Sequence, residues 1–195
     1  MNNSIKLLTK VLILDNYDSF TYNLKHQLEV NEIKVDVFKN DEISLDAVEQ
    51  YDKIILSPGP GLPSSAGIMP ELIKKFAPSK PILGICLGHQ AIGEAFGGRL
   101  KNLNRVFHGV AGKIFFKDEG LFKNMPYPFL AGRYHSWVVD ENYLPEELII
   151  TSRDEYGNIM GLKHKILNIH GVQFHPESIM TPNGDQIINN WLNLD

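Results

Sequence analysis

The sequence predicts an α/β fold, a single domain over residues 1–195 with a mostly parallel, mixed central sheet flanked by helices. Up to Gly98, short apolar runs alternate with amphipathic stretches, and this order is typical of a parallel sheet with helices on both faces. Beyond Gly98 the pattern changes to short strand-like pieces, which predict an antiparallel extension of the same sheet. No linker or shift in composition divides the chain, whose length suits one sizeable core.

The first predicted helix follows an apolar strand. Phe20, Leu24 and Leu28 recur every four residues, so this helix should bury one face. Asp18 or Ser19 is the expected N-cap, because short polar side chains accept hydrogen bonds from the free N–H groups of a first turn.

The other elements expected in this half are strands at 11–15, 33–37, 53–56 and 81–86 and helices at 44–50, 70–76 and 89–96. In the second half we expect strands at 112–116, 133–139, 147–152, 158–164 and 166–174 and a last helix near 185–192.

Composition excludes several classes of function. Lys and Arg number 19 against 23 Asp and Glu, a net charge of −4, and no basic run exceeds Lys74-Lys75, so we expect no nucleic-acid partner. Apolar runs such as 11–14 are far shorter than the roughly twenty residues of a membrane span. Residues 1–10 lack the apolar core of a secretory signal, and one Cys cannot form an internal disulfide. These observations predict a cytoplasmic protein with a free thiol.

The only cysteine, Cys86, lies in GICLG, where a predicted strand meets a predicted helix. Glycines two positions before and after it let the backbone turn sharply and lift the side chain out of the sheet, as in a nucleophile elbow. A helix N-terminus or a nearby histidine favours the reactive thiolate. Most free cysteines are small buried hydrophobes, but the flanking glycines would weaken a plain buried strand. We therefore interpret Cys86 as a nucleophile.

A cysteine nucleophile needs a base, which a third group usually orients. Of the seven histidines only His175, in VQFHPES, has a carboxylate two positions on, at Glu177. Residues two apart in an extended chain project to the same side, so Glu177 can hold the imidazole. By itself this tripeptide is better interpreted as a surface turn. Beside an elbow cysteine we interpret it as a base and its orienting group.

Two further loops follow predicted strands. SPGPGLP at 57–63 lies at the same sheet edge as Cys86, and its glycines allow the close approach of backbone N–H groups that an oxyanion hole requires, with the N–H of Leu87 as a second donor. An ordinary turn explains this loop equally well. DNYDSFTYN at 15–23 could hold a phosphate, but we favour a helix cap with core aromatics because it contains no glycine.

With these motifs the chain resembles the class I (triad) glutamine amidotransferases over its whole length. The segments that carry the resemblance, in the family's order and spacing, are LILDNYDSFTYNL, ILSPGPGLP, PILGICLGHQAIGEAFGG and GVQFHPES. The resemblance implies Cys86 as nucleophile, His175 as general base and acid, and Glu177 as its orienting carboxylate. It also implies contacts to the substrate L-glutamine from Gly59, Pro60, Gly61, Leu87, Gln90, Ser136 and Trp137.

NYDSFTYN and YHSWVV point to the branch of this family that serves chorismate-using synthases. The resemblance there is to the glutaminase subunit of anthranilate synthase in tryptophan biosynthesis. The alternative is the glutaminase subunit of aminodeoxychorismate synthase in p-aminobenzoate and folate biosynthesis, or a subunit shared by both. The motifs run from about 11 to 178 and leave too little chain for an acceptor-activating domain. The implied partner is therefore a separate synthase large subunit, component I of either enzyme, and no metal or organic cofactor is implied.

Two interpretations outside this family remain open from the residues alone. An elbow nucleophile does not by itself specify glutamine, so a thiol hydrolase of peptides or esters is one alternative. A non-catalytic flavodoxin-like binding module, with 15–23 as its anion loop, is the other.

Overall fold

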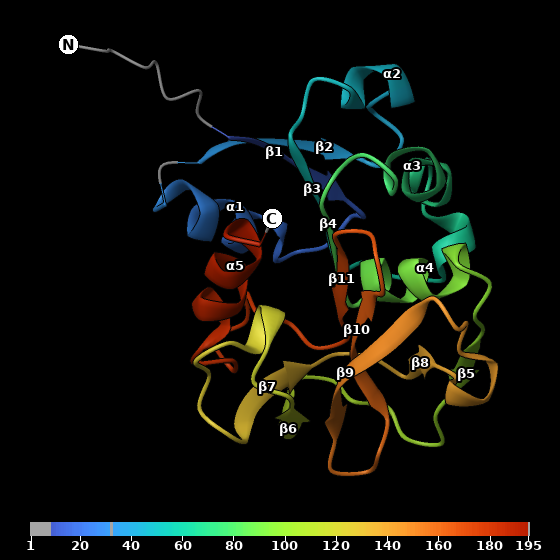
Figure 1. Ribbon diagram of the computed structural model, residues 1–195, viewed down its shortest axis with the longest axis vertical. Helices are drawn as coiled ribbons and strands as arrows, with labels where there is room; N and C mark the ends of the chain where they lie inside the picture. The colour runs from blue at the N-terminus through green and yellow to red at the C-terminus, as the bar shows by residue number, and fades with distance from the viewer. Residues whose placement is uncertain (1–8, 32, 195) are drawn as a thin grey trace.

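The structure, a computed structural model, describes residues 9–31 and 33–194, and over these residues nine strands form one mixed sheet (Figure 1). The strand order is β2-β1-β3-β4-β11-β10-β9-β6-β7; the five strands from β2 to β11 run parallel, and each later pair is antiparallel. Two further strands, β5 and β8, pair in a small antiparallel sheet. The strands are β1 Lys10–Asp15, β2 Lys34–Lys39, β3 Lys53–Leu56, β4 Ile82–Ile85, β5 Leu100–Asn102, β6 Val110–Phe116, β7 Phe129–Arg133, β8 Trp137–Val139, β9 Leu148–Asp154, β10 Ile159–His164 and β11 Ile169–Val172.

Helices cover both faces of the parallel part of the sheet (Figure 1). They are α1 Thr21–Glu29, α2 Leu45–Val48, α3 Met69–Phe76, α4 Leu87–Ala95 and α5 Gly184–Leu192, with short 3-10 turns at Pro63–Ser65, Gly120–Phe122 and Glu141–Tyr143. On one face, α1 and α5 bury residues such as Leu24 and Trp191 against alternate residues of the strands. On the other, α3 and α4 bury residues such as Phe76 and Ile92 against the intervening residues. This two-sided burial explains why the parallel strands are continuous apolar runs.

The topology gathers the chemistry-bearing loops at one edge of the sheet. The strands β1, β3, β4 and β11 are adjacent and parallel, so their carboxyl ends meet at the same edge. The loops that leave these strands begin at Asn16, Ser57, Cys86 and Gln173. In open α/β sheets this edge is where ligands bind. The predicted α/β class, with a mixed, mostly parallel sheet flanked by helices, is confirmed.

The start of α1 differs from its prediction. The helix begins at Thr21 with Phe20 at the N-cap, so neither Asp18 nor Ser19 occupies that position. Asp18 instead accepts a hydrogen bond from the Phe20 N–H at 2.7 Å in the turn before the helix. The Phe20 side chain is 41% exposed and lies against the ring of Tyr134, so the prediction that it shares the buried face of the helix is wrong.

Two strand predictions in the second half are corrected. The segment 133–139 is not one strand, because β7 ends at Arg133 and β8 pairs with β5 in the separate sheet. The segment 166–174 contains only the short strand β11, which pairs antiparallel with β10 as predicted but also pairs in parallel with β4, and so joins the two parts of the sheet. The helix predicted at 44–50 is shorter, although Ser44 caps it through the N–H of Ala47.

Residues 1–8, over which the sequence predicts no secretory signal, lie outside the described residues. Within residues 9–31 and 33–194, none of the helices has both the length and the apolar content needed to cross a bilayer.

Burial in the centre of the sheet predicts that the same substitution, Ile to Ala, lowers the free energy of unfolding much more at a buried site than at an exposed one. Ile55 on β3 is fully buried, whereas Ile166 is 89% exposed in the turn before β11. Ile55→Ala should lower the free energy of unfolding by about 2–5 kcal/mol, because it removes apolar contacts and leaves a cavity. Ile166→Ala should change it by less than about 0.5 kcal/mol. Urea unfolding of both variants and the wild type measures this difference, and equal effects would contradict the core described above.

Candidate active site

Cys86 occupies a sharp turn between β4 and α4. Its φ of 50° and ψ of −98° lie on the side of backbone space that residues other than glycine rarely adopt. A Cβ on Gly84 would lie 2.5 Å from the carbonyl of Gly88, and a Cβ on Gly88 would lie 2.5 Å from the carbonyl oxygen of Leu56. Both glycines are therefore required for the close packing of the strand-to-helix turn that presents the sulfur.

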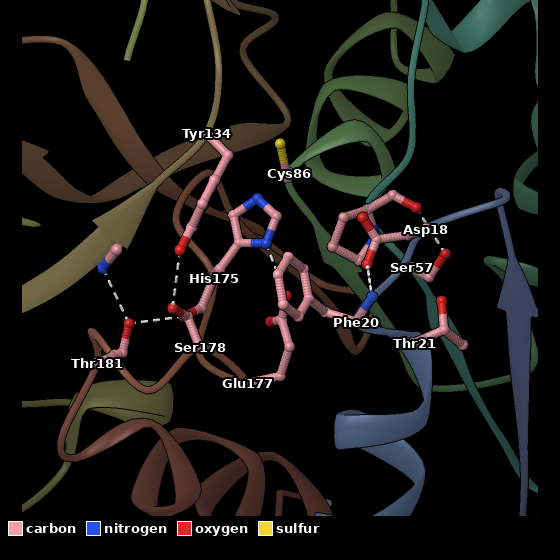
Figure 2. Close-up of polar contacts among 12 residues, drawn as sticks. Asp18, Phe20, Thr21, Ser57, Cys86, Tyr134, His175, Glu177, Ser178 and Thr181 are labelled. Carbon is pink, nitrogen blue, oxygen red and sulfur yellow. Dashed lines mark hydrogen bonds and ion pairs between the residues drawn. The ribbon is translucent and has the colours of Figure 1, made fainter. Parts of the chain in front are cut away.

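His175 is held by backbone contacts after the end of β11. Its N–H donates to the carbonyl of Gly132 at the end of β7, 3.0 Å away. The Thr181 hydroxyl donates to the His175 carbonyl at 2.6 Å and accepts from the Gly132 N–H at 2.9 Å (Figure 2). These bonds fix the position of the imidazole relative to the sheet, although His175 lies outside a regular strand.

The His175 ring is paired with Glu177. Its Nδ1 lies 2.6 Å from Glu177 Oε1, both side chains are buried, and the other ring nitrogen lies on the side of Cys86 (Figure 2). Burial of His175 opposes its charged form, but the adjacent Cys86 and Glu177 outweigh burial and raise the pKa of His175 well above its usual value. The geometry is that of an imidazole oriented by a carboxylate and directed at a thiol.

A cavity of about 170 Å³ opens beside Cys86. Its lining contains Cys86 and every residue predicted to contact glutamine, and adds two more: Gly59, Pro60, Gly61, Cys86, Leu87, Gln90, Tyr134, His135, Ser136 and Trp137. These residues come from the loop after β3, the start of α4 and the segment between β7 and β8. His175 and Glu177 are buried beside Cys86 and are not part of this lining.

The loop 15–23 adjoins this cavity, and its aromatic side chains are exposed and do not pack in the core. Tyr17 lines a second cavity of about 540 Å³ that shares Pro60, Gly61 and Leu87 with the first. Tyr17 and Tyr22 are mostly exposed, so the prediction that the aromatics of this loop lie in the core is wrong. Polar groups of the loop form hydrogen bonds within the protein. The Asn16 N–H donates to Ser57 Oγ at 2.8 Å, and the Thr21 hydroxyl donates to Asp15 at 2.7 Å.

Sequence reasoning missed three side chains of the site. Tyr134 packs edge-on against the His175 ring with centroids 4.8 Å apart (Figure 2), and His135 lines the cavity. Gln173 places its side-chain Nε2 3.5 Å from Cys86 Sγ. The alternation that paired His175 with Glu177 also places Gln173, two positions earlier, on the same side of the chain.

Two buried histidines near the site are neutral. Burial lowers the pKa of His89 to about 4, with the backbone of Gly171 opposing the shift. Burial, and then the positive charge of Arg133, lower the pKa of His135 to about 3. Both imidazoles therefore stay uncharged at neutral pH, and His175 is the histidine of the site that favours the protonated form.

Comparisons with known proteins agree with this geometry. The sequence profile of the family Glutamine amidotransferase class-I matches residues 12–194. The chain belongs to this family and is a glutamine amidotransferase, which the sequence motifs indicated, and not another thiol hydrolase or a flavodoxin-like module.

Among its relatives, the chain is 44% identical to anthranilate synthase component 2 of Pseudomonas aeruginosa, over 93% of this chain and 94% of that protein. It is 46% identical to the bifunctional protein TrpGD of Thermotoga maritima over 96% of this chain, which spans only 33% of that longer protein. A solved structure described as a GMP synthase subunit from Thermoplasma acidophilum shares the fold, with a TM-score of 0.86 and 24% identity over 95% of this chain and 92% of that one.

The depressed pKa of His89 predicts a loss of stability in acid. Between pH about 6.5 and about 4 the unfolded chain binds a proton at this histidine and the folded chain does not, so the free energy of unfolding falls as the pH decreases. His89 contributes about 3 kcal/mol to this fall in the free energy of unfolding. In His89→Met the difference in unfolding free energy between pH 6.5 and pH 4 should shrink by about this amount. Urea unfolding at the two pH values measures it, and an unchanged difference would contradict a neutral buried His89.

Proposed function

We propose that this chain hydrolyses L-glutamine through Cys86, His175 and Glu177 and passes the ammonia to component I of an anthranilate synthase. The observation that carries the proposal is the cavity beside Cys86, whose lining contains every residue that the family resemblance assigns to glutamine. The buried imidazole–carboxylate pair beside the sulfur supports the same assignment. In this proposal the chain acts as one amidotransferase domain.

Attack on glutamine begins at the sulfur. The Cys86 thiolate adds to the side-chain amide carbon, and the charge develops on the amide oxygen. Leu87 is the first residue of α4, where N–H groups have no partner within the helix, so its N–H can donate to this oxyanion. A backbone N–H of the loop at 59–61, across the cavity, supplies a second donor.

His175 moves the protons of both half-reactions. As an imidazolium it gives a proton to the departing nitrogen, which leaves as ammonia while the glutamyl thioester forms on Cys86. The neutral imidazole then takes a proton from water, whose oxygen attacks the thioester carbon and releases glutamate and the thiolate. The raised pKa of His175 supports the first role, and the bond to Glu177 keeps the ring aimed at the sulfur in both.

The ammonia needs an acceptor enzyme that covers the site. Ammonia released into neutral water becomes ammonium, which is not a nucleophile, so direct transfer is required. Exposed apolar side chains near the site support a docking partner there. Tyr17 lines the larger cavity, Phe20 contacts Tyr134, and Ile179 is almost fully exposed two residues beyond Glu177. The relatives named anthranilate synthase component 2 favour anthranilate synthase as this partner.

Cys86→Ser should reduce conversion of glutamine to glutamate by a factor of about 10³ or more, because a serine hydroxyl is a poor nucleophile beside a histidine set to act on a thiol. The assay follows glutamate release with the synthase partner present. Synthesis driven by added ammonium salt should persist, which serves as the control for folding and assembly. Wild-type glutaminase activity in this variant would overturn the assignment of the nucleophile.

The acceptor is identified by mixing the protein with purified component I of each synthase, chorismate and glutamine. We expect anthranilate as the aminated product with anthranilate synthase component I. Formation of 4-amino-4-deoxychorismate alone would identify aminodeoxychorismate synthase component I as the partner instead. Formation of both products would indicate a shared subunit. With neither product, while each component I remains active with ammonium salt, the acceptor would be an enzyme of another class.

A further inference from the structure

Gln173 is a buried polar side chain that the mechanism above does not use. It is the residue directly after β11, it is fully buried, and its Nε2 lies 3.5 Å from Cys86 Sγ. The sulfur therefore has a second polar neighbour besides His175. What this neighbour does depends on whether its amide presents an N–H donor or its carbonyl oxygen to the sulfur.

The neighbours of Gln173 determine the orientation of its amide. Gln90 places its Nε2 2.9 Å from the carbonyl oxygen of Trp137, which can only accept a hydrogen bond, so this end of Gln90 is the NH₂ group. The same Nε2 lies 3.1 Å from the side-chain oxygen of Gln173. Because a donor must face an acceptor there, Gln173 turns its own NH₂ group to Cys86.

The order of donors and acceptors continues to a buried ion pair. Arg133, which can only donate, contacts His135 Nε2 from its Nε at 3.3 Å, and it is paired with Asp154 at 2.7 Å. His135 must therefore carry its proton on Nδ1, which donates to the carbonyl oxygen of Trp137 at 3.1 Å. The Trp137 carbonyl oxygen therefore accepts from His135 on one side and from Gln90 on the other. Gln90 in turn donates to Gln173, which leaves the NH₂ group of Gln173 facing the sulfur.

We propose that Gln173 stabilises the thiolate form of Cys86 by donating an Nε2–H hydrogen bond to Sγ. Hydrogen bonds to an anionic acceptor are stronger than those to a neutral one, so this donor favours the anion over the thiol. The Gln173 amide transfers no proton in the reaction and acts as a positioning residue for the sulfur. Gln90, which lines the cavity, holds Gln173 in this orientation. The inference rests on the proposed function in that Cys86 is taken as the nucleophile.

The test measures the reactivity of the sulfur without its substrate or partner. Cys86 is the only cysteine, so an iodoacetamide adduct on the full chain reports this site alone. In Gln173→Met, which keeps the side-chain length but removes the donor, alkylation at pH 7 should be about tenfold slower. The midpoint of the pH profile of alkylation should rise by about one unit. A purely structural role would not move this midpoint.

Two more variants make the test decisive. Gln186→Met makes the same change at a partly buried glutamine of α5 that bonds Asn190, and it should keep the wild-type profile. Gln173→Glu keeps the oxygen that faces Gln90 and replaces the donor with an acceptor, so it should also slow alkylation. It provides the test if Gln173→Met does not fold. Thermal unfolding identifies which variants are folded.

An unchanged pH profile in a folded Gln173 variant overturns the inference. The result is separable from the proposed function, because loss of glutaminase activity in Cys86→Ser does not depend on Gln173. If Cys86→Ser is inactive and the Gln173 variants alkylate normally, the assignment of Cys86 as nucleophile is retained and the assignment of Gln173 as hydrogen-bond donor is wrong. If Cys86→Ser retains glutaminase activity, the proposed function fails, and the alkylation profile still decides whether Gln173 acts on the sulfur.

Discussion

The sharp backbone turn at Cys86 determines where the other groups of the site must meet. β4 passes into α4 with no intervening loop, and this is possible only because Gly84 packs on Gly88 and Gly88 packs on Leu56 of the neighbouring strand. The backbone of Cys86 is held in a sparsely populated conformation, which costs about 1–3 kcal/mol. The packing of α4 against the sheet offsets this cost, and the sulfur is raised at the edge of the sheet where other loops can meet it.

β11 is the second determinant because it carries His175 and Gln173 to that edge. It lies beside β4 in parallel register, with Val172 opposite Ile85, so the residues that follow the two strands emerge side by side. The chain beyond β11 is then held by Gly132 of β7 and by Thr181. The antiparallel half of the sheet thus supports His175, while the parallel half supports Cys86.

Charge is buried close to the site and is compensated there. Arg133 and Asp154 form an ion pair in the interior, and Asp154 also accepts hydrogen bonds from Tyr156 and Asn158. A buried pair is weak evidence for stability, since removing two charges from water is costly. Here its effect is positional, because Arg133 also fixes the neutral tautomer of His135 and, through Trp137, one wall of the cavity.

The α/β class, most strand positions and the pairing of the proposed nucleophile with its base can be predicted from the sequence alone. These depend on spacing along the chain: apolar runs for buried strands, glycines around Cys86, and a two-residue separation between His175 and Glu177. Contacts between distant parts of the chain place Phe20 against Tyr134 and outside the core, and they make β11 the strand that joins the two halves of the sheet. The fold also sets the orientation of the Gln173 amide, because Gln90 donates both to the Trp137 carbonyl and to the Gln173 side-chain oxygen. These residues lie far apart in the sequence, so each amide takes its orientation from partners that only the folded chain supplies.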